Sequence, residues 1–204
     1  DFVDLYRSLA ALGKQNGLAQ VFDLFEENNT AYAVREPDDG VPFLAYLQTR
    51  KVPLTQNEAI TLLRPVVYGV EALHRCGLLH RGISPETIFI TADGRATLSG
   101  YATLGLRTAD SELKSQLYEG YAAPEQYAVA EFDGKYTDVY ALAALFYRAM
   151  TGKTPVTARL RRKNDMLVAP DTIERTMPAF VSAALMRALR LDPVQRIQTV
   201  SGLL

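Results

Sequence analysis

Residues 139–147 (VYALAALFY) form a stretch that is apolar on every side of a helix, not only along one stripe. A helix without a polar face is stable in water only when other elements enclose it on all sides. The stretch therefore predicts a helix through the middle of a mostly helical domain. Gly152 follows it and predicts where this helix ends.

Hydrophobic spacing, capping residues and turn residues predict further elements on both sides of this helix. Thr55 and Glu58 form a capping box at the start of a long helix, and Asn28-Asn29 is a turn signal between two strands. The expected helices cover 2–12, a long segment from Thr55, and about 178–190 with Pro178 in the first turn; the expected strands cover 18–25, 31–35, 88–91 and 95–98. Residues 99–121 show no clear period and predict a long loop.

The segment PDDG at residues 37–40 has the composition of a linker and is the first plausible domain boundary. We therefore expect an α+β fold in two parts. Residues 1–40 would hold one helix and a β-hairpin, and residues 41–204 would form a mostly helical body with a second, smaller hairpin.

Composition and charge limit the classes of function. Hydrophobic residues make up 48% of the 204 residues and charged residues 22%, which is ordinary for a globular domain with a real core. A net charge of −1 creates no long-range field toward nucleic acid or a membrane surface, and the apolar runs are too short to cross a bilayer. The single cysteine, Cys76, excludes an internal disulfide and is expected to be packed. It favours a reducing location, and we predict that the protein is cytoplasmic.

Three stretches in this order resemble motifs of protein kinases: HRGISPET from His80 to Thr87, APE from Ala123 to Glu125, and DVYAL from Asp138 to Leu142. In that family they correspond to the catalytic loop His-Arg-Asp-x-x-x-x-Asn, the end of the activation segment and the start of the central helix of the large lobe. Neighbouring stretches such as GYAAPEQY look most like bacterial serine/threonine kinases. The resemblance implies a protein kinase-like fold, with residues 1–40 as a truncated N-lobe and hinge and residues 41–204 as the C-lobe.

Protein kinases use ATP and magnesium, but the positions that would handle them are altered here. Gly82 stands where the family has the carboxylate that accepts the proton of the substrate hydroxyl, and Thr87 and Gly100 stand at the two magnesium ligands. Further departures from the family pattern are Ser84, Tyr101 and Ala102. We therefore expect no catalytic residue, no bound cofactor and no metal in this chain.

The N-lobe positions are equally altered. By alignment with the family, Leu5 stands where a helix carries a glutamate, or Asp4 if the alignment shifts by one residue, and no G-x-G-x-x-G occurs in the chain. The hinge and nucleotide-pocket positions correspond to Arg35, Glu36 and Phe89. Arg35 is a charge where an apolar residue is normal. We interpret it as a side chain whose stem can fill the pocket while its head meets an anion or water.

Residues that maintain the kinase shape are retained. The resemblance implies a buried ion pair between Glu125 and Arg196, and hydrogen bonds from the catalytic-loop backbone to Asp138. His80 and Arg81 also remain, and we interpret His80 as a core histidine rather than a catalytic base. An internal stack that joins the two lobes can be filled by Leu9, Val21, His80 and Tyr101.

The split between retained framework and lost chemistry predicts a pseudokinase, a kinase-fold protein that acts by binding rather than by catalysis. It would serve as a scaffold or allosteric regulator of a protein partner, such as an active kinase or another domain of a parent chain. Strand 31–35 would leave an uncovered sheet edge, which also allows pairing with a second copy of the chain. A weak or atypical ATP-dependent serine/threonine kinase, or another transferase, stays open as the alternative.

Overall fold

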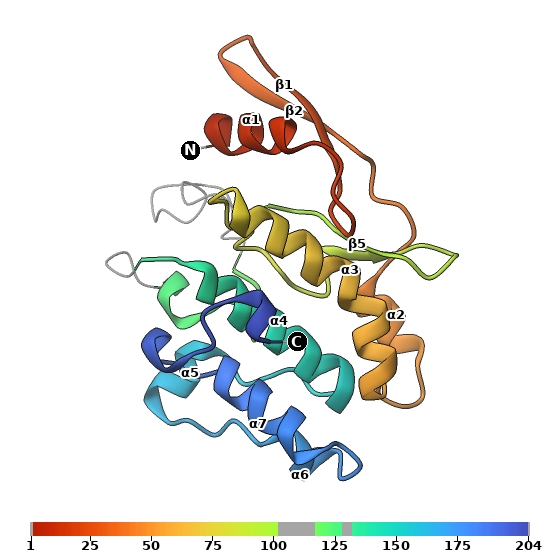
Figure 1. Ribbon diagram of the computed structural model, residues 1–204, viewed down its shortest axis with the longest axis vertical. Helices are drawn as coiled ribbons and strands as arrows, with labels where there is room; N and C mark the ends of the chain where they lie inside the picture. Colours follow the sequence, from red (N-terminus) through yellow and green to blue (C-terminus); the bar gives the residue numbers. More distant parts are fainter. Residues whose placement is uncertain (1, 102–116, 128–131, 204) are drawn as a thin grey trace.

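The computed structural model describes residues 2–101, 117–127 and 132–203. A helix and a two-stranded hairpin from the N-terminal end lie above a larger, mostly helical body (Figure 1). This is the α+β arrangement that the sequence predicts. Ala102 and most of the long loop expected over 99–121 lie outside the described residues.

The N-terminal part consists of helix α1 (Phe2–Leu12) and strands β1 (Val21–Glu27) and β2 (Thr30–Arg35). Leu5 and Leu9 of α1 are buried, as the helical spacing predicts. The strands pair antiparallel around Asn28 and Asn29, whose φ angles of 52° and 55° are those of a tight hairpin turn that matches the twist of the strands. The predicted helix and hairpin are therefore confirmed, although the first strand starts only at Val21.

Three short strands form a second sheet: β3 (Val41–Pro42), β4 (Ile88–Ile90) and β5 (Ala96–Leu98), in the spatial order β3-β4-β5. The pair β4 and β5 confirms the smaller predicted hairpin. The sequence did not predict β3 or the helix that follows it, α2 (Phe43–Thr49). Helix α2 has no capping side chain at its start, and its 7 residues are too few to show a clear helical period.

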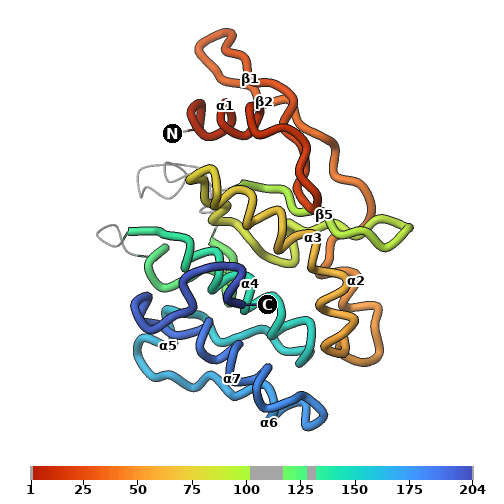
Figure 2. Tube along the Cα trace, in the orientation of Figure 1, coloured from red at the N-terminus to blue at the C-terminus, as the bar shows by residue number. Residues whose placement is uncertain are grey.

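A short segment ties the N-terminal part to this sheet. Leu18 bridges Leu98, and two hydrogen bonds of 2.8 Å run from the N–H of Ala19 to the carbonyl of Leu98 and from the N–H of Leu98 to the carbonyl of Gly17. Gly17 has a left-handed φ of 78°, and a Cβ atom there would lie 2.1 Å from the backbone of Pro65. Only glycine therefore fits this contact, where the red chain descends to β5 (Figure 2).

Helix α3 (Gln56–Arg75) begins at the predicted capping box. The hydroxyl of Thr55 accepts from the N–H of Glu58 over 3.3 Å, and the Glu58 carboxylate accepts from the N–H of Thr55 over 2.8 Å. The two ends of the box satisfy backbone donors that the first turn of a helix leaves unpaired.

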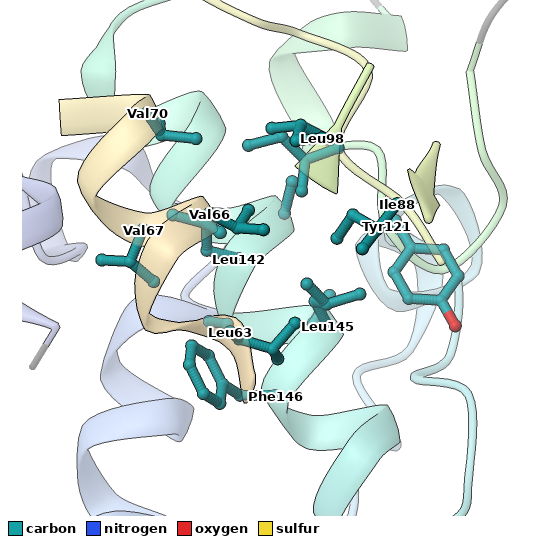
Figure 3. Packing of buried hydrophobic residues seen from close by; sticks show 14 of the residues in the cluster. Leu63, Val66, Val67, Val70, Ile88, Leu98, Tyr121, Leu142, Leu145 and Phe146 are labelled. Atoms are coloured by element: carbon teal, nitrogen blue, oxygen red, sulfur yellow. The ribbon is translucent and has the colours of Figure 1, made fainter. Parts of the chain in front are cut away.

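Helix α4 (Lys135–Thr151) is the enclosed helix predicted from residues 139–147, and nearly all of its residues from Thr137 onward are buried. Leu142 and Phe146 of α4 pack against Leu63 and Val66 of α3 (Figure 3). Gly152 ends α4 in a left-handed conformation with φ of 69°, as predicted.

The lower body contains α5 (Ala158–Lys163), α6 (Pro170–Ile173), α7 (Ala179–Ala188) and the 3-10 turns η2 (Pro124–Tyr127), η3 (Pro193–Gln195) and η4 (Val200–Gly202). Helix α7 confirms the last predicted helix, but Pro178 is its N-cap rather than a residue of its first turn. The prediction that Cys76 is packed is wrong: it is exposed, because it lies at the C-cap of α3, beyond the buried stripe of that helix. Within the part of the chain that the structure describes, no helix has the length and apolar character needed to cross a bilayer.

Candidate functional site

The loop from His80 to Thr87 is held by a buried carboxylate, Asp138, in the first turn of α4. Its two oxygens accept from the N–H groups of His80 and Arg81 over 2.8 Å each. Nε2 of His74 lies 2.8 Å from the same carboxylate. Burial pushes the pKa of Asp138 up, but the hydrogen bond and charge of His74 and the contacts with His80 outweigh it, so that the pKa lies below its ordinary value. Asp138 therefore remains an anion that fixes the backbone of this loop.

His74 is a framework residue that the sequence analysis missed. It lies in the last turn of α3 and is buried, 64 positions before the carboxylate that it meets. One signal was available: His74 continues the face of α3 on which Leu63, Val67 and Val70 are buried. A histidine on a buried stripe needs a polar partner, and Asp138 is that partner here.

His80 is fully buried, and its position fits a core residue rather than a base in contact with solvent. Its Nδ1 accepts the N–H of Gly82 over 3.2 Å, and its ring centroid lies 4.6 Å from that of Tyr101. Burial lowers the pKa of His80 to about 4, although the charge of Asp138 acts in the opposite direction. The ring is therefore neutral at pH 7.

Arg81 is fixed at three points in addition to its left-handed φ of 63°. Its N–H donates to Asp138, its carbonyl accepts from Nε2 of Gln126 over 2.9 Å, and its Nε donates to Asp133 over 2.9 Å. Gln126 and Asp133 come from distant positions in the chain, and the sequence analysis did not single out either of them. Together these groups hold the loop in one backbone conformation.

The Thr87 side chain forms hydrogen bonds within the loop. Its hydroxyl donates to the carbonyl of Gly82 over 2.8 Å and accepts from the N–H of Ser84 over 3.0 Å. The side chain is buried, and its methyl carbon would lie 2.8 Å from a Cβ atom at position 100, where Gly100 has φ of 73°. The hydroxyl is thus committed to the loop itself, and the methyl group occupies the space beside Gly100.

The hinge positions form two ion pairs. Arg35 binds Asp38 through both nitrogens of its fork, over 2.7 Å and 2.8 Å. This hydrogen bond is the main cause that lowers the pKa of Asp38 and raises that of Arg35, while partial burial acts against both shifts. Glu36 pairs with Lys14, which is the main reason that the pKa of Glu36 is lowered.

The predicted pocket residues at the hinge lie as follows. The anion that the head of Arg35 meets is Asp38, and the Arg35 side chain keeps 38% of its surface exposed. The hydroxyl of Ser99, next to Gly100, also interacts with Asp38. Phe89 lies half-buried in β4, where it pairs with Thr97 of β5.

Arg196 and Glu125 form a buried, bidentate ion pair, with distances of 2.6 Å and 3.1 Å. Thr137 donates to the same carboxylate over 2.8 Å, and the guanidinium of Arg196 lies 5.1 Å from the ring centroid of Tyr140. The pair joins the η2 turn, the start of α4 and the C-terminal end of the described chain. It is a structural anchor below the loop.

Leu9, Val21, His80 and Tyr101 are all buried and belong to one hydrophobic cluster or line it. They come from α1, β1, the loop and the segment that follows β5, so they lie on both sides of the boundary between the N-terminal part and the body. Tyr6 adds an edge contact to Tyr101, with ring centroids 6.2 Å apart.

Three features of the site agree with the comparison to known families. They are the His-Arg loop bound by the Asp138 carboxylate, the buried Glu-Arg ion pair and the enclosed central helix. The model of the protein kinase domain matches residues 7–197. The chain belongs to the protein kinase family. Its fold class and its relation to serine/threonine kinases, predicted from the three motifs, are confirmed.

Known kinases of bacteria are among the relatives. Serine/threonine-protein kinase PknL of Mycobacterium tuberculosis is 32% identical over 154 residues, which cover 74% of this chain and 38% of that protein. A probable serine/threonine-protein kinase of Clostridium perfringens is 24% identical over 206 residues, which cover 97% of this chain and 30% of that protein. The chain thus spans roughly a third of the length of these relatives.

Solved kinase structures show the same fold. The apo form of PpkA-294 superposes with a TM-score of 0.80 at 26% identity, over 99% of this chain and 72% of its own. The PknI kinase domain of M. tuberculosis superposes with a TM-score of 0.73 at 23% identity, over 97% of this chain and 72% of its own.

The kinase cofactor, ATP with magnesium, does not fit the groups at positions 82, 87 and 100. Gly82 and Gly100 have no side chain, and the Thr87 hydroxyl already bonds to the loop backbone. Magnesium binds oxygen ligands, usually with at least one carboxylate. In the described ranges, no group of three or more His, Cys, Asp or Glu side chains could hold a metal ion.

Proposed function

We propose that this chain is a pseudokinase that acts by binding a protein partner, as a scaffold or as an allosteric regulator, in the cytoplasm. The observation that carries the proposal is the joint replacement at positions 82, 87 and 100. Loss of general base catalysis alone costs roughly 10² to 10⁴ in rate, or about 3–5 kcal/mol in barrier. Loss of both metal ligands removes the main electrostatic contribution to phosphoryl transfer as well.

The retained framework supports a binding role. Asp138, Gln126 and Asp133 fix the loop around Arg81 with hydrogen bonds of 2.8–2.9 Å. A frame that is held by its own side chains keeps its shape without a nucleotide, which is what a scaffold requires.

The contacts at the hinge support the part of the proposal that this chain does not bind ATP. Arg35 stands at the position that guards the nucleotide pocket in the family, and both Nη atoms of its guanidinium donate to the Asp38 carboxylate. An adenine base carries no charge that could replace either partner, so opening this pair for a nucleotide would exchange two charge-assisted hydrogen bonds for contacts with water.

The hairpin supplies the surface through which a protein partner binds. Phe22, Phe25, Tyr32 and Val34 are 55%, 44%, 42% and 43% exposed, and the rings of Phe25 and Tyr32 stack at 5.2 Å. In the described residues β1 and β2 form a sheet of only two strands. An open strand edge beside exposed aromatic rings favours pairing with a strand of another protein or of a second copy.

A thermal-shift measurement with ATP and magnesium tests the proposal, with the PknL kinase domain as a positive control. A ligand that binds the native state at 100 times its Kd stabilises it by about 2.7 kcal/mol, so real binding is readily seen. We expect no magnesium-dependent shift and no transfer of γ-phosphate to the chain or to a generic protein substrate. A shift that requires magnesium, or labelled product above the blank, favours a weak or atypical kinase instead.

A further inference from the structure

An apolar pocket lies on the body between α3, α4 and α7, in a different part of the fold from the hairpin (Figure 1). Its volume is about 110 Å³. An apolar cavity of about 150 Å³ in another protein accepts a benzene molecule, so this pocket has room for roughly one large apolar side chain. Its lining is apolar apart from Gln56 and includes Ile60, Phe146, Phe180, Ala184 and Leu203.

A second pocket of about 260 Å³ adjoins the first, since Gln56 and Met150 line both. It lies at the first turns of α3 and α7, and Glu174 is part of its lining. The Glu174 carboxylate accepts from the hydroxyl and the N–H of Thr176 over 2.7 Å and 3.2 Å. It also offsets the partial positive charge at the amino ends of the two helices. We call the two pockets together the α3–α7 groove.

Two arginines flank the apolar pocket at its other end. Arg64 lies one turn after Ile60 on the same face of α3, and Arg187 lies one turn after Ala184 on α7. Both side chains are exposed, and within the described ranges neither forms an ion pair or a hydrogen bond. The helix dipole accounts for only part of this charge, because the carboxyl end of α7 is worth about half a negative charge and Arg64 lies in the middle of α3.

The C-terminal part of the chain carries an excess of positive charge. Residues 152–204 contain nine Lys or Arg and four Asp or Glu, although the whole chain has a net charge of −1. An acidic partner is therefore attracted to this side of the molecule, and a basic partner is repelled from it.

We propose that the α3–α7 groove binds a short protein segment in which one large apolar residue is flanked by Asp or Glu. The apolar side chain fills the pocket as a buried anchor, and the acidic side chains pair with Arg64 and Arg187. This inference rests on the proposed role of the chain as a binding protein. It gives the scaffold a second surface besides the hairpin, so that two partners can bind at once.

Selection of short random peptides displayed in a library, followed by calorimetric titration of the enriched peptides against the native chain, tests the groove. Ala184→Met is the informative variant, because methionine fills the pocket without a change of charge. Ala183→Met is the matched control, since Ala183 is exposed on the same helix and does not line the pocket. We expect the enriched peptides to share an apolar residue beside acidic ones. They should bind to Ala184→Met about tenfold more weakly than to Ala183→Met, whose affinity should equal that of the native chain.

A second pair of variants tests the charges. Arg187→Glu reverses a charge beside the pocket, and Lys163→Glu makes the same change in net charge at an exposed lysine that does not line the groove. We expect roughly tenfold weaker binding to Arg187→Glu than to Lys163→Glu, as is typical for one hydrogen bond to a charged group. High salt should reduce this difference.

The absence of enriched peptides, enrichment of peptides without acidic residues, or equal affinities for Ala184→Met and Ala183→Met would overturn the proposal. Self-association that persists in Tyr32→Glu and is lost in Ala184→Met would also overturn it, because the groove would then hold a second copy of the chain. These titrations involve no nucleotide. Their failure would leave the pseudokinase proposal intact, and a magnesium-dependent shift with ATP would leave the affinities of the groove unchanged.

Discussion

The methyl group of Thr87 lies where a side chain at position 100 would have to go: a Cβ atom built on Gly100 would be 2.8 Å from Thr87 Cγ2. The backbone of Gly100 also has φ of 73°, a conformation that L side chains adopt only with strain. The replacement at one of the family's metal positions, Thr87, therefore sterically favours glycine at the other, position 100. A side chain at position 100 therefore requires a shift or a replacement of Thr87.

This relationship predicts a coupling between positions 87 and 100. Gly100→Ala should lower the free energy of unfolding by about 2–4 kcal/mol, because overpacking adds to the left-handed strain. Thr87→Ser removes the methyl and keeps the hydroxyl, so in that background Gly100→Ala should cost about 1–2 kcal/mol, the strain alone. Urea denaturation of the four proteins measures the cycle. Additive effects would show that the methyl group does not fill the space.

His80 predicts how stability depends on pH. Its pKa is about 4 in the folded state, whereas an unfolded histidine titrates near 6.5. Between these values the unfolded chain binds the extra proton and the folded chain does not, so stability falls as pH decreases from 6.5 to 4. The loss is about 3 kcal/mol at 1.4 kcal/mol per unit. The stability that Asp138 contributes is fully present above its ordinary pKa of 3.8 and is lost only as pH falls below that value, because its pKa in the folded state is lowered.

The variant His80→Asn tests this assignment. Asparagine offers an acceptor near the place of Nδ1 for the N–H of Gly82 but does not titrate. Its unfolding free energy, measured by urea denaturation from pH 4 to 7, should be flatter than that of the native chain over this window. An unchanged slope would assign the dependence to another group.

Because Glu125 and Arg196 form a buried ion pair, we expect a large decrease in the free energy of unfolding when one partner is replaced by an uncharged residue. Arg196→Met leaves the Glu125 carboxylate buried without its cation, which typically costs 3–5 kcal/mol. The double variant Glu125→Gln with Arg196→Met should lose less than the sum of the two single changes. Arg95→Gln is the control, because Arg95 and Asp93 form a pair with 74% and 60% exposed side chains. Arg95→Gln should change the free energy of unfolding by less than about 0.5 kcal/mol. Equal decreases for the two pairs would contradict the structural role given to Glu125 and Arg196.

The hairpin predicts self-association when no other partner is present. Light scattering should show a mass that rises with concentration toward a dimer, because two open strand edges can pair. Tyr32→Glu places a charge in the stacked aromatic pair and should return the chain to a monomer. Phe180→Glu, at a residue 71% exposed on α7, is the control and should leave association unchanged. A clean monomer at high concentration would exclude the second copy and leave a different protein as the partner.

The sequence predicts those elements whose signals are local. Thr55 and Glu58 specify the start of α3 within four positions, and Asn28-Asn29 specifies a turn by its backbone preference. The uninterrupted apolar stretch of α4 specifies burial without reference to any partner. Helix α2 lacks such a signal, because it has no capping side chain and only 7 residues.

The site is less predictable because its contacts cross the chain. Gln126 meets Arg81 across 45 positions, and His74 meets Asp138 across 64. The sequence shows which catalytic groups are missing, since that follows from the motif alone. It does not show that Thr87 fills the space beside Gly100, because that contact exists only once β5 lies next to the loop.

The bridge between Leu18 and Leu98 has a mechanical consequence. The chain passes between its two parts at residues 17–19, where it is hydrogen-bonded to β5, and again at residues 36–40. The same strand, β5, is joined to the His80–Thr87 loop by the hydrogen bond from the N–H of Ser99 to the carbonyl of Thr87. A partner that binds the hairpin is therefore connected to that loop through an unbroken series of backbone hydrogen bonds, with β5 as the shared element.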